Sequence, residues 1–229
     1  MPSLLLSGHT FSYQINRKKI RSLRLSITSK NSFSLSAPLF TPTLFINNFI
    51  RQHHAWIIKS AAKFSDFPPI SSLSSLSILG QTYPLLFSQS SKNNILISRL
   101  QKKIIIQTTS LSQTHLVSLF QKRFKLYAKK VVAKEIKKFT QFSYNHLTLR
   151  NQKSRFGSCS SRGNLNFNWQ IIFFPPDKFR HIILHELVHL KVKNHSKFFW
   201  QTLASYDPGW KTNNLWLKKH GTACYIIKP

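Results

Sequence analysis

The segment from Pro175 to Lys193 constrains the fold of this chain more than any other. It opens with two prolines and Asp177, which is typical of a helix start, because proline cannot extend a preceding element and aspartate caps the exposed amides of the first turn. The residues that follow predict one helix over 178–193. Inside it lies the run HELVH at residues 185–189, so its two histidines, four residues apart, project from one face.

Three histidines at this helix are candidate ligands of a single metal ion. His185 and His189 can reach one ion, and His195 follows just past Asn194, where a helix can end because asparagine tolerates the left-handed conformation. Three protein ligands leave the fourth position of zinc open for water, which is the arrangement of catalytic zinc sites. Glu186 is rotated by about 100° from His185 and can flank the ion as the base that takes a proton from the bound water. We therefore expect one zinc ion per chain.

Other side chains compete for these roles. His181 lies one turn before His185 on the same stripe and could replace one of the ligands, and Cys159 is a candidate additional ligand. Asp207 is a candidate acceptor for the free ring nitrogen of a ligand, a role that a backbone carbonyl fills equally well. The histidines on either side of Glu186 are the better assignment, because only they place a carboxylate beside the ion.

Acidic residues are scarce, and this restricts the chemistry available to the chain. Only 5 Asp and Glu stand against 34 Lys and Arg, which gives a formal net charge of +29. Carboxylate-pair chemistry of the kind that glycosidases use and carboxylate-rich magnesium sites are therefore disfavoured. Any acid or base work by a carboxylate falls on one of these residues: Asp66, Glu135, Asp177, Glu186 and Asp207.

The positive charge favours an anionic partner. A lysine-rich composition also arises from base-composition drift, but drift toward lysine does not explain the shortage of carboxylates. Residues 111–139 predict a helix with one apolar stripe and lysines largely elsewhere. The alternative to a docking face is a solvated helix surface. The candidates for non-specific contact with nucleic acid or another polyanion are Lys129, Lys130, Lys134 and Lys137.

The first half of the chain reads as strand-rich. Apolar residues alternate with polar neighbours over 11–37, which predicts three half-buried strands. A helix is expected from Pro42 to Phe64, because proline suits the first helical position and large apolar residues then recur at helical spacing. Short strands are expected around 83–87, 95–97 and 104–106.

These elements suggest how the chain is divided. We expect a strand-rich region with one helix over residues 1–108 and a catalytic region with the candidate metal ligands over residues 109–229, or one continuous domain. The length of 229 residues is enough to bury a core, and 41% hydrophobic residues argue for a folded globule. No internal repeat is evident in the sequence.

A small polar segment separates two further expected strands. Residues 147–149 and 165–169 have strand character, and residues 154–160 between them read SRFGSCS, too small and polar to form core. We expect a loop near the cleft, with Arg155 and Ser158 as candidate substrate-binding residues. The alternative is a structural turn in which the glycine is chosen for its backbone freedom.

No segment predicts membrane insertion or secretion. No stretch approaches the roughly 20 apolar residues that a membrane span needs, and the leucines at residues 4–6 are too short a run for the core of a secretory signal. Cys159 and Cys224 are too few for a disulfide framework and are expected to be unpaired. We expect a cytoplasmic protein with no membrane partner, and the sequence does not indicate its oligomeric state.

Three segments carry a family resemblance. They read SRFGSCSSRGNLNFNW at residues 154–169, HELVHLKVKNHSKFFW at 185–200 and WLKKHG at 216–221. Together they resemble the YgjP-like metal-dependent hydrolases, a zincin group related to the SprT-like proteases. The likeness is dense over residues 150–221 and looser before them. Phe156 departs from the pattern, because the family usually has tryptophan there.

The resemblance implies a function as well as a site. The expected fold is α+β, a minimal zincin-like metallopeptidase half preceded by a mixed strand and helix region. The expected reaction is hydrolysis of peptide bonds in a protein or peptide substrate, through a zinc-bound water activated by Glu186. The implied zinc ligands are His185, His189 and His195.

Two other functions remain open. One is zinc-dependent hydrolysis of a nucleotide phosphoanhydride, which the basic surface suits. The few carboxylates argue against a magnesium-assisted form of that reaction. The other is a nucleic-acid-binding module with a structural metal. Closed structural sites usually have four protein ligands, and only three are convincing here.

Overall fold

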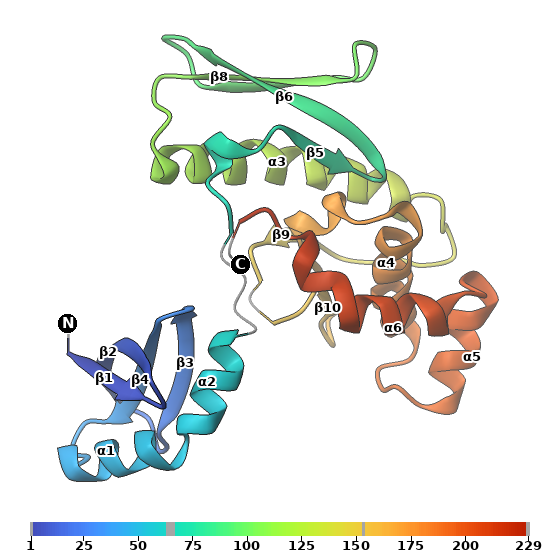
Figure 1. Cartoon of the computed structure of the whole chain (residues 1–229). Helices are drawn as coiled ribbons and strands as arrows, with labels where there is room; N and C mark the ends of the chain where they lie inside the picture. Colours follow the sequence, from blue (N-terminus) through green and yellow to red (C-terminus); the bar gives the residue numbers. More distant parts are fainter. Residues whose placement is uncertain (1, 63–66, 153, 228–229) are drawn as a thin grey trace. The chain divides into compact units, whose positions relative to one another are not determined.

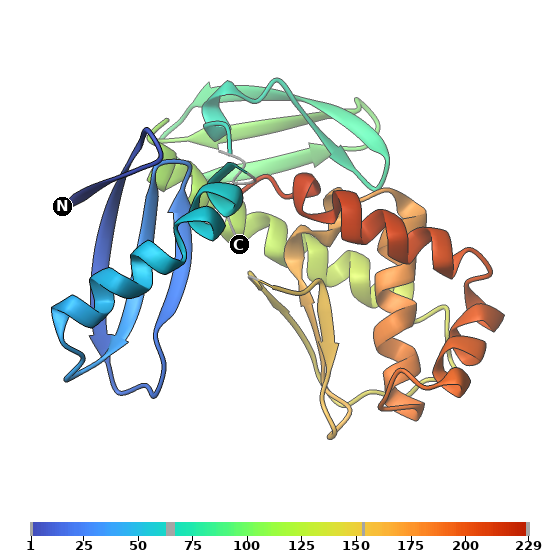
Figure 2. The same cartoon turned by 60° about the horizontal axis from the view of Figure 1, so that its bottom comes forward.

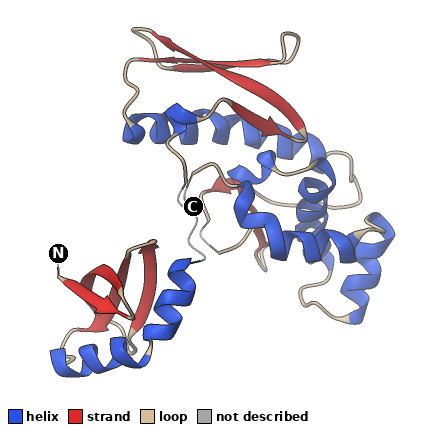
Figure 3. Ribbon diagram, in the orientation of Figure 1, coloured by secondary structure: helices blue, strands red, loops and turns tan. Residues whose placement is uncertain are grey.

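The structure is a computed structural model that describes residues 2–62, 67–152 and 154–227 (Figure 1). The chain divides into two compact units, residues 1–66 and residues 67–229. Both units contain helices and strands (Figure 3), so the α+β prediction is confirmed. None of the helices in the described part of the chain has the length and apolar character of a membrane span. The expected cytoplasmic location stays a prediction.

The first unit is a four-stranded sheet covered by two helices. Strand β2 pairs in parallel with β4, and the edge strands β1 and β3 pair antiparallel with β2 and β4. Buried strand residues such as Phe33 and Leu35 pack against Ile46, Ile50 and Ile57 of the helices. The elements are β1 (Ser3–Leu6), β2 (His9–Lys18), β3 (Arg24–Ser29), β4 (Ser32–Pro38), α1 (Thr43–Gln52) and α2 (His54–Ala62).

The alternating pattern over 11–37 correctly predicted β2, β3 and β4, but the helix expected from Pro42 to Phe64 is two helices. The break is at His53, whose backbone leaves the helical region with φ −104° and ψ 15°. The ring Nδ1 of His53 lies 2.9 Å from the carbonyl of Phe49, a local contact that a helical-spacing argument does not include. The last residues of the expected helix, 63 and 64, lie outside the described residues.

The second unit begins with another four-stranded sheet, which lies across the long helix α3 (Figure 1). The expected strands around 83–87, 95–97 and 104–106 are present, and β5 was not expected. Helix α3 buries a stripe that includes Leu116, Phe120 and Phe124. The elements are η1 (Ile70–Ser72), β5 (Ser75–Ile78), β6 (Gln81–Gln89), β7 (Asn94–Ser98), β8 (Lys103–Thr108) and α3 (Gln113–Ile136).

The two sheets are copies of one topology. In each, the first hairpin is antiparallel, the second strand pairs in parallel with the fourth, the third pairs antiparallel with the fourth, and a helix follows. Both first hairpins turn through two residues with positive φ, Ser7-Gly8 at 46° and 81° and Leu79-Gly80 at 49° and 80°, as a type I′ turn requires. The chain therefore contains an internal structural repeat.

The repeat corrects the expectation that none is present. The sequence does not reveal the repeat, because the two copies have buried side chains at equivalent positions but different residues there. Phe33 and Leu35 in β4 occupy the buried positions that Ile104 and Ile106 fill in β8. Any large apolar residue satisfies such a position, so the two segments keep a fold without keeping a recognisable sequence.

The rest of the second unit holds a small sheet and three helices. In the order β10-β11-β9, β11 pairs antiparallel with β10 and in parallel with β9. Figure 2 shows this sheet beside α4. The elements are β9 (Leu147–Arg150), β10 (Gly157–Cys159), β11 (Leu165–Asn168), η2 (Trp169–Phe173), α4 (Pro176–Lys191), α5 (Lys197–Tyr206), α6 (Trp210–His220) and η3 (Gly221–Cys224).

Two local expectations change here. The segment 154–160, expected to be a loop, contains strand β10, because its backbone pairs with β11 even though its side chains are small and polar. The strand expected to reach Trp169 ends at Asn168, whose side chain accepts a hydrogen bond from the amide of Gln170 and starts a 3-10 turn. The predicted helix over 178–193 is α4.

The observed boundary between the two units follows residue 66, whereas the expected boundary lay between residues 108 and 109. Helix α3 joins the sheet β5–β8 to the later elements through one hydrophobic core, in which Phe124 lies 6.4 Å from Trp169 and 5.4 Å from Phe173 between ring centroids. A boundary just before α3 would cut this core. Sequence patterns show where strands end and helices begin, but not which core a strand joins.

Candidate metal centre

Helix α4 carries three of the candidate residues and is packed into the core along one face. Its apolar face is fully packed, with Ile183, Leu184 and Leu187 among the residues buried in the core. Rigid packing on that side fixes the directions of His185 and His189 on the other. The helix ends at Lys191, and the chain then returns His195 toward the same face before α5 starts at Lys197.

The three histidines converge on one point. The Nε2 atom of His195 lies 3.0 Å from that of His185 and 3.2 Å from that of His189. Zinc bonds of about 2.0–2.1 Å in a tetrahedral arrangement place neighbouring nitrogens roughly 3.3 Å apart. The observed spacing therefore fits a zinc ion. Within the described residues, these three form the group of histidine, cysteine and acidic side chains that could hold a metal.

The protonation of the rings also suits metal binding. His189 Nδ1 donates to the carbonyl of Val192 at 3.0 Å, which leaves the Nε2 lone pair free. Burial, reinforced by the neighbouring His189 and His195, lowers the pKa of His185 to about 3. Burial also lowers the pKa of His189. Both rings are therefore neutral near pH 7, the form that binds metals.

Two aromatic side chains after the motif support the rings. Phe199 is fully buried, and its ring centroid lies 5.0, 4.5 and 4.8 Å from those of His185, His189 and His195. Trp200 stacks on His195 at 5.5 Å and donates from its indole nitrogen to the His195 carbonyl at 3.1 Å. Sequence reading gave neither residue a part in the site. The only signal was their position next to the third histidine.

Glu186 lies beside this centre and is almost fully enclosed, with 7% of its surface exposed. Burial raises the pKa of Glu186 to about 8, while the charge of Arg155 and a hydrogen bond from the backbone of Cys159 lower it. A cleft of about 310 Å³ brings Glu186 and Arg155 together with His185.

Gly157 explains why β10 can lie so close to α4. A Cβ atom at this position would come within 2.7 Å of Glu186 Cγ and 2.9 Å of Glu186 Oε1. The residue must therefore be glycine to admit the carboxylate, which differs from the turn role considered in the sequence. Ser158 follows Gly157 on the strand and points to the opposite face, because successive strand residues alternate. Arg155 lines the cleft and Ser158 does not.

His181 and Asp207 form a separate network. Asp207 Oδ2 lies 2.6 Å from His181 Nδ1, and both Asp207 oxygens accept from Asn213 at 3.1 Å. Lys178, buried behind them, donates to Asn213 at 2.6 Å. Asp207 thus partners His181, where the sequence had offered it as an acceptor for a metal ligand. His181 lines the cleft but does not join the three converging nitrogens.

Cys159 also stands apart from the metal group. Its thiol is half-buried, and Sγ lies 3.5 Å from the carbonyl oxygen of Ser160. Burial raises the pKa of the Cys159 thiol, which keeps it protonated and disfavours it as a ligand. Cys224 is free as well, so the expectation of two unpaired cysteines is confirmed.

Two of the segments behind the family resemblance meet in space. A Cβ atom at Gly221 would overlap the ring of Phe156, so the closing glycine makes room for that aromatic side chain. The Phe156 ring also packs on Phe174 at 5.4 Å and Tyr225 at 6.2 Å. Phenylalanine in place of the usual tryptophan therefore retains an aromatic contact that holds β10 near α6.

Comparison with known proteins supports this assembly. Residues 21–220 match the family model described as YgjP-like, metallopeptidase domain. The match covers the three histidines, Glu186 and Arg155. A comparison with curated proteins finds no match. Among solved structures, the chain is similar to the crystal structure of the metallopeptidase zymogen of Methanocaldococcus jannaschii jannalysin, with 25% identity, a TM-score of 0.34, and coverage of 40% of this chain and 94% of that one.

The ligand assignment predicts how zinc content responds to substitution. Purified protein should carry close to one zinc per chain, measured by elemental analysis. His195→Ala should lose zinc much as His189→Ala does, because each removes one of three nitrogens. His181→Ala should retain zinc, since Asp207 holds that ring outside the group. Loss of metal from His181→Ala alone, or no zinc in the parent protein even after zinc is added, would show the assignment to be wrong.

The contact between Gly157 and Glu186 predicts a steric sensitivity. Gly157→Ala should displace the carboxylate and lower peptide hydrolysis at least tenfold while zinc is retained, with a stability loss of about 1–3 kcal/mol from overpacking. Gly209→Ala is the matched control, because its added Cβ would meet neighbours at an ordinary 3.6 Å. Peptide turnover, zinc content and thermal unfolding should be measured for both variants. Equal activity in the two would refute the close-approach argument.

Proposed function

The chain belongs to the YgjP-like metallopeptidase family, and on that basis we propose that it hydrolyses peptide bonds with one zinc ion held by His185, His189 and His195. The observation that carries the proposal is the convergence of three imidazole nitrogens beside a buried carboxylate, with Nε2 of His195 3.0 Å from that of His185 and 3.2 Å from that of His189. Nitrogen ligands from imidazole suit zinc better than they suit calcium or magnesium, which prefer oxygen. When bound, zinc acidifies water toward a pKa of about 7 and polarises a carbonyl group.

Glu186 is the proposed proton carrier. It takes a proton from the attacking water and returns it to the amine that leaves when the peptide bond breaks. Its position is fixed by α4 on one side and by the close approach of Gly157 on the other. Burial raises the pKa of Glu186 to about 8, and the charge of Arg155 and the hydrogen bond from the backbone of Cys159 offset only part of that shift. Ionised Glu186 is the form that accepts the proton.

The substrate is proposed to bind as an extended peptide along β10. This strand pairs with β11 along one edge and stands at the end of its sheet. Edge strands bind extended peptides through main-chain hydrogen bonds. Gly157 would bring such a peptide next to Glu186, and Arg155 in the cleft could donate to a substrate carbonyl. The substrate-binding role of the Ser158 side chain stays a prediction, and its direction on β10 does not favour it.

The structural-metal alternative finds no support in this geometry. Closed structural zinc sites usually have four protein ligands, and three are found among the described residues. The three nitrogens also lie beside a cleft of about 310 Å³ and a buried carboxylate, which a purely structural ion would not need. A catalytic metal therefore accounts for more of the observed arrangement.

Replacement of Glu186 separates chemistry from metal binding. Glu186→Gln should keep zinc but lose roughly 10²- to 10⁴-fold in turnover, because the amide preserves shape and cannot accept a proton. The measurements are elemental zinc content and hydrolysis of a quenched-fluorescence peptide library. Glu135→Gln is the matched control: it removes the same charge from a carboxylate that pairs with Lys138 and Arg180. Near-normal turnover in Glu186→Gln would remove this residue from the mechanism.

The four lysines expected to contact polyanions are all exposed, three of them on α3 and Lys137 directly after its last residue. Lys130, Lys134 and Lys137 recur at helical spacing and share one stripe, whereas Lys129 lies about 100° away from it. Lys129 shares a hollow with Lys122 and Lys125 beside β9, and Lys130 lies in another hollow with Arg123. Non-specific nucleic-acid binding by Lys129, Lys130, Lys134 and Lys137 is proposed on their charge and exposure.

Charge reversal tests this face. Changing Lys129, Lys130, Lys134 and Lys137 to glutamate should flatten the salt dependence of oligonucleotide binding between roughly 50 and 200 mM, because fewer counterions are released. Zinc content should not change. Fluorescence anisotropy with single- and double-stranded oligonucleotides measures the effect. If the parent protein does not bind at the lower salt concentration, the positive charge of α3 has no polyanion partner.

A further inference from the structure

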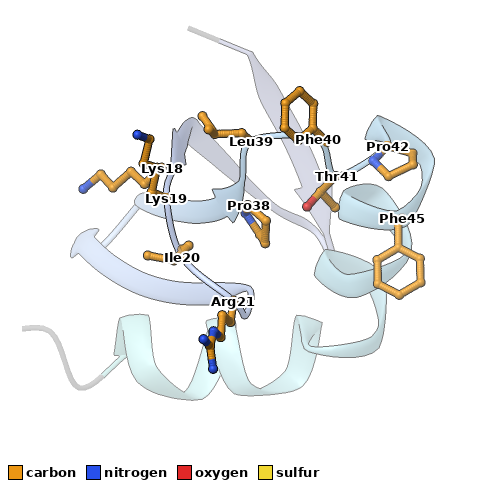
Figure 4. Close-up of a pocket in the computed structure, with 10 residues that line it drawn as sticks. All are labelled: Lys18, Lys19, Ile20, Arg21, Pro38, Leu39, Phe40, Thr41, Pro42 and Phe45. Carbon is orange, nitrogen blue, oxygen red and sulfur yellow. The ribbon is translucent and has the colours of Figure 1, made fainter.

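The first unit carries an open cleft at the end of its sheet. The cleft, of about 620 Å³, lies between the loop after β2 and the loop between β4 and α1 (Figure 4). Its lining combines three cations, Lys18, Lys19 and Arg21, with two aromatic rings, Phe40 and Phe45. We refer to these five residues as the basic-aromatic cleft. They play no part in the metal centre.

The charge of this region is not neutralised. The first unit, residues 1–66, contains nine Lys and Arg and one acidic residue, Asp66, so no carboxylate occurs among residues 1–62. Three of the nine cations line the cleft. Such a concentration of one sign attracts anions, and it lowers the stability of the unit through repulsion unless an anion binds.

The aromatic rings of the cleft lie open to solvent. Phe40 is 94% exposed and Phe45 is 64% exposed, which is unusual for large apolar side chains grouped in one place. The loop that carries Phe40 is held in place by Arg17, whose guanidinium donates to the carbonyls of Leu39 at 3.0 Å and Thr41 at 2.7 Å. Phe40 is therefore an exposed ring on a loop whose backbone is fixed by hydrogen bonds, which suits it for contact with a partner.

The internal repeat provides a comparison within the same chain. At the equivalent place in the second sheet, Asn93 links the two loops: its Oδ1 accepts from the Thr109 amide at 2.9 Å and lies 2.9 Å from His115 Nε2. The hollow there is about 240 Å³ and has no charged lining residue. The fold thus does not require an open, basic cleft. The first copy has one because of its own residues.

We propose that the basic-aromatic cleft binds single-stranded nucleic acid, for which single-stranded RNA is the probe. Unpaired bases stack on exposed aromatic rings, while Lys and Arg follow the phosphate backbone. Figure 4 shows the lysines on one side of Pro38 and the rings of Phe40 and Phe45 on the other, so a strand can present phosphates and bases to different walls. Single-stranded RNA offers splayed bases in loops and at ends, whereas a duplex hides its base faces.

The test uses the full chain and labelled twelve-nucleotide oligonucleotides at about 100 mM salt, with binding measured by fluorescence anisotropy. Phe40→Leu and Phe45→Leu keep apolar volume but remove the stacking face, so each should weaken single-stranded RNA binding about tenfold. Leu44→Ala is the control, because Leu44 is on the same helix as Phe45 and is 74% exposed but does not line the cleft. It should change binding less than about twofold.

Two double variants that remove the same charge distinguish a specific binding site from general electrostatic attraction. Lys18→Gln with Lys19→Gln should weaken RNA binding several-fold more than Arg51→Gln with Lys59→Gln, since each pair removes two cations and only the first pair lines the cleft. All variants should keep the zinc content and peptide turnover of the parent protein, so this result does not depend on the proposed hydrolysis. Circular dichroism checks that each variant is folded.

Several results would overturn the proposal. Equal losses from the two charge pairs would mean that binding follows net charge alone. Unchanged binding in both Phe→Leu variants would exclude stacking and favour a lipid surface or an acidic peptide, which leucine still contacts. Equal binding of an RNA duplex would exclude recognition of a single strand. Failure of both single-stranded RNA and single-stranded DNA to bind the parent protein would leave the cleft without a nucleic-acid ligand.

Discussion

The close approach of α4 to β10 is the contact on which the rest of the site depends. Glu186 on the helix and Gly157 on the strand come so near that no side chain fits between them. The strand keeps the carboxylate out of water, and burial sets its raised pKa. The same strand leads back to Arg155, so one contact fixes both the carboxylate and the cation that faces the cleft. Gly221 and Phe156 hold the other side of β10 in the same manner.

The three converging histidines depend on a second constraint, the packing of α5 beneath them. Phe199 touches the rings of all three histidines and is fully buried, so it fixes the distance of these rings from the core. His195 comes from a loop, and loops are less rigid than helices. Its stacking on Trp200, together with the indole hydrogen bond to its carbonyl, supplies the order that a helix would otherwise give. Removal of a buried Phe ring costs about 3–5 kcal/mol, so Phe199 matters to the fold as well as to the three histidines.

The sequence predicted what depends on short spacing. Residues four apart on a helix must share a face, so the grouping of His185 with His189 and the place of Glu186 beside them followed from periodicity, and the structure brings His195 to the same point. Alternating burial likewise predicted β2, β3 and β4. These features are local, and tertiary packing did not override them.

Features that depend on distant partners could not be predicted in this way. Gly157 is required by Glu186, and Asp207 is taken by His181 rather than by a ligand, yet nothing in the local sequence names either partner. The expected helix from Pro42 to Phe64 is divided at His53 by a local contact, and the repeat is defined by buried positions that accept any large apolar residue. The identity of a residue predicts structure where a chemical role requires that residue type. It predicts little where any side chain of similar volume can fill the position.

The few carboxylates are unevenly distributed along the chain. Each described acidic residue lies in the second unit and has a specific role: Glu186 faces the metal centre, Glu135 pairs with Lys138 and Arg180, Asp177 pairs with Lys178, and Asp207 pairs with His181. Burial opposes ionisation of Glu135, but its two cationic partners prevail and lower the pKa of that carboxyl.

Glu135, Glu186 and Asp207 are largely buried, whereas Asp177 is an exposed carboxylate that pairs with the buried Lys178. An exposed ion pair is worth only about 0–1 kcal/mol, so surface carboxylates can be lost at little cost to the fold. No carboxylate occurs among residues 1–62, so the cations there are unopposed. The fold tolerates that charge because its core of Phe33, Leu35 and Ile46 is entirely apolar. Net charge alone therefore does not identify a binding face. The placement of cations beside exposed rings, absent from the second copy of the same fold, is the more specific observation.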